Sequence, residues 1–362
     1  MLRRILRPSP RRSNLHLLMF QDAPMTPAER KAKLQDERHE PLLAQLRNDI
    51  RNEVARDLPK FRAREAEFDA IDTGELLSIY LNWKYRQIHP HRREVVYSNQ
   101  LLQRMQTNEE LYAPVESELN ELVRILKAGE DLLALGLLSP GVVRKPYEVK
   151  PDYSRLSRES HLDLLLNEQG IHHLHLPGLE RKKNTPIVYA IFEPEHAFLL
   201  DLARQDDYQT DRLARISCEN WPQRHFLKLP IDGLADGAGN QIDLKDQQRV
   251  TVRNNAINTP IKMAAASYLT PRSGGVMANG FAQSVVRMSQ SIWNSLSLFA
   301  IRRYRPRFDE YFLESTGKPL PENPTFHFRF LTTESEWAYA IFEEISDCAF
   351  LLPDNFGVTR AI

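Results

Sequence analysis

The sequence contains little cysteine, no excess of charge of either sign and no long apolar run. Its 362 residues include only Cys218 and Cys348, too few for a disulfide framework, which favours a reducing compartment. Lysine plus arginine (48) balance aspartate plus glutamate (48), so no net charge attracts the molecule to nucleic acid or to an anionic membrane. No apolar run approaches the ~18 residues of a membrane span. We therefore expect a soluble, cytoplasmic protein without a membrane partner.

Motifs that would identify the commonest cofactor-dependent enzymes are missing. Neither Gly-x-x-x-x-Gly-Lys-Ser/Thr nor Gly-x-Gly-x-x-Gly occurs, so nucleotide binding of those two kinds has no support. The sequence also lacks His-Glu-x-x-His, paired Cys-x-x-Cys and the Gly-x-Ser-x-Gly nucleophile elbow. These gaps predict no cofactor and no metal, and they leave open whether the protein is an enzyme.

What is present is a change of apolar spacing along the chain. Residues 1–30 begin with a cluster of arginines and no acid before Asp22, which indicates a basic disordered tail or a mis-assigned start. Apolar residues then recur at three and four positions, predicting a helical domain over 31–138. The proline-containing stretch 139–153 is typical of a linker, and 154–362 mixes short strand-like runs with helices.

One short pattern occurs twice in the second half of the chain. Tyr-Ala-Ile-Phe-Glu occupies 189–193 and 339–343, and Ala-Phe-Leu-Leu follows at 197–200 and 349–352. Nine identities in one order within one chain favour a diverged internal repeat. We therefore predict an α+β fold in which a helical N-terminal domain precedes a duplicated helix-plus-three-strand antiparallel β unit, at about 155–202 and 285–354.

Polar side chains alternate with apolar ones on the first strand of each predicted unit. His173 and His175 alternate with leucines, and His327 and Arg329 alternate with phenylalanines, so each pair shares one strand face. If the units pack about a pseudo-twofold axis, the four side chains line one cationic groove. Two imidazoles can serve there as general acid and base on a phosphodiester, with the arginine holding the developing charge and no metal.

This hypothesis predicts a phosphodiesterase or ribonuclease-like activity, with RNA or a nucleotide as the partner. The pattern is similar to that of enzymes with two His-x-Ser/Thr strands in a duplicated fold, but His175 and Arg329 stand at the hydroxyl positions. Two other readings remain: a non-enzymatic interaction or scaffold protein with a plain solvated polar face, and a metal-dependent hydrolase. For the metal, His173 with His175, or His89 with His91, would need completion by another ligand. The candidates for that ligand are Asp163, Glu193, Asp201 and His196.

Two further segments carry candidate binding residues. A basic, aromatic loop interrupted by Pro90 could meet phosphates and stack on bases, or could be a helix end with a core tryptophan. Its candidates are Trp83, Lys84, Tyr85, Arg86, Arg92 and Arg93. The second segment is the turn with Arg272, Gly274 and Gly275, whose amides could hold an anion at a helix start or simply cap that helix.

Overall fold

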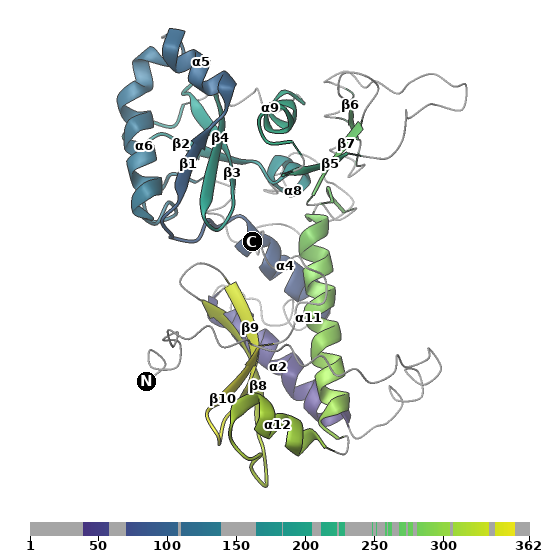
Figure 1. Cartoon of the computed structure of the whole chain (residues 1–362). Helices are drawn as coiled ribbons and strands as arrows, with labels where there is room; N and C mark the ends of the chain where they lie inside the picture. The colour runs from purple at the N-terminus through teal and green to yellow at the C-terminus, as the bar shows by residue number, and fades with distance from the viewer. Residues whose placement is uncertain are drawn as a thin grey trace, which may run out of the picture.

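The computed structural model divides the molecule into an upper and a lower lobe joined by long helices (Figure 1). It describes residues 39–57, 70–107, 110–138, 164–182, 184–204, 211–222, 224–228, 248, 251, 258, 260–262, 268–272, 274–277, 281–304, 307–332 and 337–351. The predicted tail 1–30 and the predicted linker 139–153 lie outside these residues, and so does most of the helix predicted before the first strand. Within the described part of the chain, no helix is both long enough and apolar enough to cross a bilayer.

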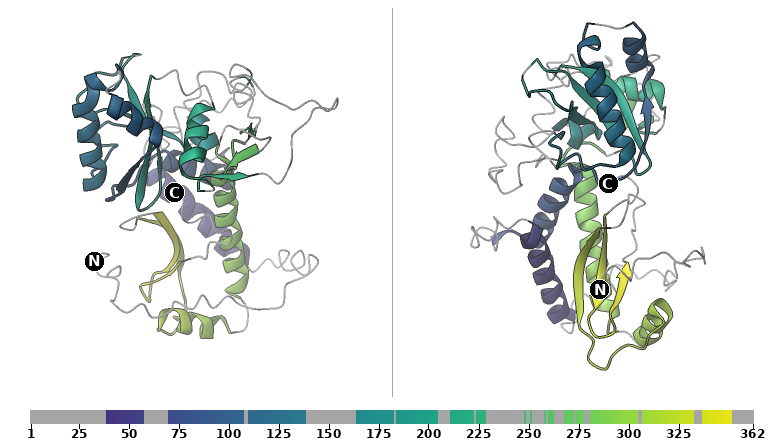
Figure 2. Two further views of the ribbon diagram at one scale, coloured as in Figure 1. Left: turned by 45° about the horizontal axis from the view of Figure 1, so that its top comes forward. Right: turned by 90° about the vertical axis from the view of Figure 1, so that its left-hand side faces the viewer.

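The upper lobe is built on a mixed sheet of four strands in the order β1-β4-β3-β2. Its strands are β1 (Glu94–Tyr97), β2 (His172–His175), β3 (Ile187–Phe192) and β4 (His196–Ala203). β1 runs parallel to β4, and the other neighbours are antiparallel. One face packs on α5 (Asn99–Thr107) and α6 (Glu116–Ala128), with η4 (Ala113–Val115) between them. The other face packs on α8 (Leu164–Gln169) and α9 (Arg212–Asn220), so helices cover both faces (Figure 2).

A small sheet completes the upper lobe beside α9. Its order is β5-β7-β6, and both pairings are antiparallel. The strands are β5 (Phe226–Lys228), β6 (Ile261–Lys262) and β7 (Tyr268–Pro271). Ala214 and Cys218 of α9 share a buried cluster with Phe226 and Ile261, so this sheet is fastened to the lobe by apolar contact.

The lower lobe packs helices against an antiparallel sheet in the order β10-β9-β8. Its strands are β8 (Phe326–Thr332), β9 (Trp337–Glu343) and β10 (Cys348–Leu351). Its helices are α2 (Glu40–Asp57), α4 (Thr73–Tyr85), α11 (Gln283–Arg302) and α12 (Phe308–Thr316). The apolar spacing in α2 and α11 is the one the sequence predicts. It places apolar side chains on one face of each helix, where they pack in one core: Leu46, Ile50, Ile292 and Leu296.

The two cores show that the upper lobe is inserted into the lower one. The lower core draws on residues 42–83 and 282–348, whereas the upper clusters draw on residues 88–269. The chain thus leaves the lower lobe after α4 and returns before α11, and these helices lie side by side (Figure 2). Asn82 Oδ1 accepts from the Ala282 amide at 3.3 Å, and Ser289 Oγ donates to the Gly74 carbonyl at 2.9 Å.

This packing differs from the predicted succession of domains. The helices expected to form one domain over 31–138 divide between two cores, because α2 and α4 pack below while α6 packs on the upper sheet. That interval also contains β1, which sequence spacing did not predict. β1 is only four residues long, and it is a strand because its backbone pairs with β4, which lies about a hundred residues away in sequence.

The repeated residues form the same hairpin in each lobe. Phe192 pairs with Ala197 and Ile191 with Phe198; the second copy pairs Phe342 with Ala349 and Ile341 with Phe350. The strand before each hairpin does not pair as the sequence superposition expects. Tyr189 pairs with His173, whereas Tyr339 pairs with Phe330 and not with His327. The surrounding helices also differ, so the α+β class is observed and the duplication stays a hypothesis.

This alignment corrects the predicted superposition of the first strands. Strand pairing makes Phe330, not His327, the counterpart of His173, and Arg329 the counterpart of His172. The shift is three residues, and an odd shift exchanges the two faces of a strand. His173 therefore shares a face with Tyr189, whereas His327 and Arg329 lie on the face opposite to Tyr339.

We predict that each lobe responds separately to damage in its own core. Leu199→Ala in the upper core and Leu296→Ala in the lower core remove fully buried side chains, and each should cost ~2–5 kcal/mol of unfolding free energy. Amide hydrogen exchange should accelerate mainly in the substituted lobe, as measured by mass spectrometry of peptides. An equal acceleration in both lobes would show that the lobes unfold as one unit.

Candidate functional site

The histidine pair of β2 lies on the upper sheet's α8/α9 face. His173 and His175 pair with Tyr189 and Ile187, which belong to the cluster that packs on α8 and α9. Their ring centroids are 6.3 Å apart and the rings are nearly perpendicular, at 82°. The predicted solvated face is therefore covered by helices: His173 is half-buried and His175 is only 8% exposed.

His175 occupies an electrostatically unusual position. Burial lowers its pKa to about 4, and the positive charges of Arg181 and His173 add to the effect. Its Nε2 atom is buried and has no hydrogen-bond partner among the described residues. An unpaired buried nitrogen costs free energy, so this imidazole is held neutral with an unused donor or acceptor beside a second imidazole.

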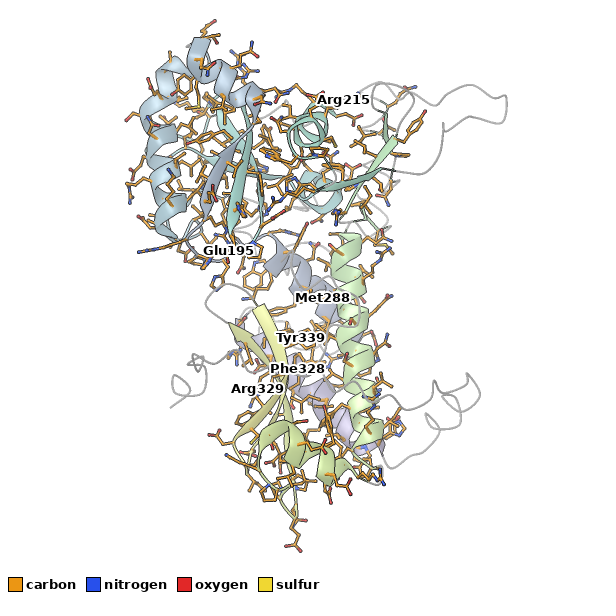
Figure 3. The ribbon with its side chains drawn as sticks, in the orientation of Figure 1. Glu195, Arg215, Met288, Phe328, Arg329 and Tyr339 are labelled. Atoms are coloured by element: carbon orange, nitrogen blue, oxygen red, sulfur yellow. The ribbon has the colours of Figure 1, made fainter. Side chains whose placement is uncertain are left out.

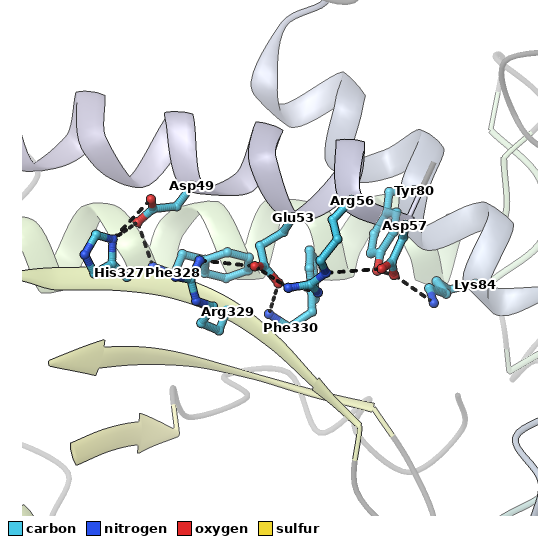
Figure 4. A network of polar contacts seen from close by, with 10 residues as sticks. All are labelled: Asp49, Glu53, Arg56, Asp57, Tyr80, Lys84, His327, Phe328, Arg329 and Phe330. Carbon is cyan, nitrogen blue, oxygen red and sulfur yellow. Dashed lines mark hydrogen bonds and ion pairs between the residues drawn. The ribbon is translucent and has the colours of Figure 1, made fainter. Parts of the chain in front are cut away.

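The second predicted pair, on β8, is engaged by carboxylates of α2 (Figure 4). His327 Nδ1 lies 3.3 Å from Asp49, and its Nε2 lies 3.5 Å from Glu344. Arg329 Nη1 lies 3.2 Å from Glu53 Oε1. These side chains therefore contribute to holding a helix against a strand, and their partners are protein carboxylates.

The same carboxylates also accept hydrogen bonds from the backbone at the free edge of β8. The Phe328 amide donates to Asp49 at 2.9 Å and the Phe330 amide donates to Glu53 at 3.1 Å. One helical turn earlier, Gln45 Nε2 donates to the Phe326 carbonyl at 2.9 Å. We call these contacts of Gln45, Asp49 and Glu53 with the β8 edge the α2–β8 clasp.

Simple geometry explains the regular spacing of the clasp. Four residues of helix rise about 6 Å and two residues of strand rise about 6.6 Å, so side chains at i, i+4 and i+8 meet alternate residues of an edge strand. The Glu53 side chain is 3% exposed, and its carboxylate also accepts hydrogen bonds from both terminal nitrogens of Arg56 at 2.8 Å. With Arg329 and the Phe330 amide, its two oxygens accept four bonds, which is the capacity of a carboxylate.

The next carboxylate along α2 binds α4 instead of the strand. Asp57 accepts from the Tyr80 hydroxyl at 2.5 Å and lies 3.1 Å from Lys84 Nζ. The hydrogen bond and the lysine charge lower the pKa of Asp57 against the opposing effect of burial, which is the largest single contribution. This stripe of polar residues therefore fixes α2 to both β8 and α4.

The structure does not bring the two predicted pairs into one groove. β2 and β8 belong to different sheets in different lobes (Figure 1). Figure 3 shows Arg329 and Phe328 on the lower sheet, while Arg215 marks α9 in the upper lobe. The hypothesis of four converging side chains thus lacks its geometric basis: His173 stays with His175 on β2, and His327 stays with Arg329 on β8.

The loop predicted to bind nucleic acid is largely buried. Trp83, Arg86 and Arg93 are between 2% and 9% exposed. Arg93 donates to the carbonyls of His89, His91 and Glu193 at 3.0–3.1 Å, so it holds the loop from inside. Their burial therefore gives no support to the predicted contact of these three side chains with nucleic acid, because they pack inside the protein.

The other members of that group are differently placed. Lys84 is 13% exposed and lies over the Trp83 ring, with Asp57 as its ion-pair partner. Tyr85 is half-buried, and Arg92 alone of the six is exposed.

The loop passes so close to Gly129 that a Cβ there would lie 2.6 Å from the Arg92 amide nitrogen. Gly129 has a φ of 75° and ends α6, so a glycine is required where loop and helix meet.

The glycine turn before α11 is filled by protein. The Gly274 amide donates to the Pro271 carbonyl at 3.0 Å, and the Arg272 amide donates to the His225 carbonyl at 2.9 Å. A Cβ at Gly275 would lie 2.2 Å from the Asn258 side chain, which bonds both backbone groups of Val276. The anion-site prediction for Arg272, Gly274 and Gly275 is corrected accordingly, since Asn258 occupies the inside of the turn.

The residues considered as metal ligands have other partners. Asp201 is fully buried between Arg104, at 2.9 Å, and Arg212. Glu193 binds Arg224 through both oxygens at 2.6 and 2.9 Å, and these bonds, with that from His225, lower the pKa of Glu193 to about 2 despite burial. His196 pairs with Glu94 at 3.5 Å. Among the described residues, no group of three ligating side chains could hold a metal ion; Asp163 lies outside those residues.

A serine, a histidine and a carboxylate are in contact elsewhere in the upper lobe. Ser217 Oγ lies 2.9 Å from His225 Nδ1, and His225 Nε2 lies 3.3 Å from Glu193. Ser217 is fully buried within α9, so a substrate cannot approach its hydroxyl. The chain of contacts instead connects α9, the residue that follows β3 and the segment before β5.

Sequence reasoning missed the residues that matter most to both pairs. Asp49 and Glu53 were indistinguishable from solvated helix residues, although their four-residue spacing with Gln45 could have indicated a polar stripe. Arg181 lies in the connection between β2 and β3, and its Nη2 bonds the carbonyls of Gly136 and Leu138. That segment pairs with β2, where the Leu137 carbonyl accepts from the His175 amide at 2.7 Å. No local signal predicts that pairing.

Comparisons with known proteins provide no relative. No family model matches the chain, and no curated protein or solved structure matches it significantly. Function must therefore be argued from the residues of the chain.

We predict that Glu53→Ala destabilises the lower lobe by about 2–4 kcal/mol. The substitution leaves the Phe330 amide, Arg329 and Arg56 without their shared acceptor, and an orphaned buried donor costs ~1–3 kcal/mol while charged bonds add to this. Chemical denaturation measures the change. Glu53→Gln is the matched control, since its amide oxygen still accepts from Phe330, and it should cost less. Equal losses for the two variants would contradict the clasp.

We also predict a contribution of His175 to the pH dependence of stability. Its folded pKa, about 4, lies below the ordinary value of about 6.5, so the unfolded chain binds a proton first as the pH falls. The contribution to stability is complete above about pH 6.5 and is lost as the pH falls towards 4. His175→Gln should flatten this part of the profile, measured by urea unfolding. His196→Gln controls for loss of an imidazole, and an unchanged slope in His175→Gln would refute the prediction.

Proposed function

We propose that the protein acts on a phosphate-containing substrate, RNA or a nucleotide, at the β2 site alone. The observation that carries the proposal is the buried, unpartnered Nε2 of His175 beside the half-buried His173. An unsatisfied buried polar group requires an explanation, and a catalytic role is one of them. The proximity of Arg181 supports the proposal, because a cation is needed to hold a phosphate.

The chemistry follows from the protonation states. At neutral pH, His175 is unprotonated, so it can take a proton from a nucleophilic hydroxyl but cannot give one. His173 is the group left to protonate the leaving oxygen. Because the Nε2 of His175 is buried, this scheme requires a movement at the half-buried His173 that lets the substrate hydroxyl reach it. His327 and Arg329 have no part in this scheme.

An interaction or scaffold protein is the second candidate. It is favoured by the structural contacts that the polar side chains make. His327 and Arg329 contact carboxylates of α2, and Arg86 and Arg93 are buried inside the protein. In this reading His173 and His175 are structural as well, and the purified protein turns over no phosphodiester.

We predict that activity separates the two pairs of side chains. His173→Gln and His175→Gln should each lower turnover of RNA or of cyclic and linear nucleotides about 10²-fold or more, the usual contribution of general acid–base catalysis. His327→Gln and Arg329→Gln should keep the wild-type turnover per folded molecule, with circular dichroism as the folding control. Equal loss in all four variants would point to one shared site, and no turnover by the wild type would favour the scaffold reading.

A further inference from the structure

Arg181 is the cation that the structure places at the β2 site. Its Nη2 donates to the carbonyls of Gly136 and Leu138, the latter at 3.3 Å, and so crosses the segment that borders β2. Among the described residues, these carbonyls are its only hydrogen-bond acceptors, and both use Nη2. A guanidinium has five N–H donors, so Nε and Nη1 remain available to a ligand, and the residue is exposed.

Neighbouring charges leave one net positive charge at this position. Lys182 is also exposed, but its Nζ pairs with Glu180 at 2.7 Å, so the two cancel. His175 is neutral at physiological pH. The charged groups that act on it, among the described residues, are Arg181 and His173. Arg181 is therefore the one permanent positive charge among these groups, and His173 adds a second while it holds the proton that the proposed function assigns to it.

We infer that the β2 site takes a singly charged phosphodiester, held by Arg181 in the role expected of Arg329. This inference rests on the proposed function and specifies its substrate class. A phosphodiester carries one negative charge, which one guanidinium balances, whereas a phosphomonoester carries about −1.5 to −2 at neutral pH. The planar guanidinium also matches two phosphate oxygens at once, which an ammonium cannot do.

The experiment compares Arg181→Gln and Arg181→Lys with Lys182→Gln, a matched loss of the adjacent exposed cation. The full-length proteins are titrated with bis(4-nitrophenyl) phosphate, a diester, and with 4-nitrophenyl phosphate, a monoester, while NMR follows the imidazoles of His173 and His175. Arg181→Gln should weaken diester binding at least tenfold, Arg181→Lys should weaken it less, and Lys182→Gln should leave it unchanged.

A measurement without ligand shows whether Arg181 lies where the structure places it. Losing its positive charge should raise the pKa of His175 in Arg181→Gln, and Lys182→Gln should not change it, as followed by NMR against pH. This readout depends on neither binding nor turnover, and Arg181→Lys retains the charge if the glutamine variant fails to fold.

Three results would overturn the inference: no diester binding by the wild type, equal weakening by Arg181→Gln and Lys182→Gln, or tighter binding of the monoester. Failure of the proposed function has a different signature. If bis(4-nitrophenyl) phosphate binds through Arg181 but RNA, which carries the nucleophilic hydroxyl, is never cleaved, the inference stands and the acid–base role of the histidines falls.

Discussion

The α2–β8 clasp is the interaction on which the arrangement of the molecule depends. Gln45, Asp49 and Glu53 satisfy the backbone groups along one edge of β8, where an unprotected strand edge would invite pairing with another chain. It also joins α2 to a strand almost 300 residues later. The lower lobe is thereby closed by both halves of the sequence, and the upper lobe can be an insertion between α4 and α11.

The clasp changes how the polar residues of the second hairpin are understood. His327 and Arg329 have the composition of a phosphate site, but carboxylates at 3.2–3.5 Å already contact both side chains. His175 is the opposite case, because its surroundings disfavour its charge and leave Nε2 unused. His327 and His175 are the same type of residue, and their neighbours decide which imidazole is available for chemistry.

Much of the secondary structure could be predicted because it depends on local spacing. The helices over 40–57 and 283–302 and the strands around 172–175 and 187–192 follow from apolar periodicity. The repeated hairpin was also visible in the sequence. β1 was missed because four residues give too little periodicity, and its strand conformation depends on β4.

The candidate site was less predictable, because strand register and burial are set by distant residues. His327 and Arg329 alternate with core-facing phenylalanines as expected, but a three-residue difference in pairing removes the expected correspondence of His327 with His173. Arg86 and Arg93 resemble surface cations in the sequence, yet the fold buries them. Within each pair the shared strand face survives from the proposed groove, since residues two apart on a strand share a face whatever the register, but the two pairs lie on different sheets.

Site-resolved amide hydrogen exchange in Glu53→Ala tests the central claim most directly. If the α2 carboxylates hold the β8 edge, the Phe330 amide exchanges faster in the variant than in the wild type. The Leu331 amide, which donates to no α2 side chain among the described contacts, changes much less. Unchanged exchange at Phe330, or equal acceleration along the whole of β8, would contradict the account.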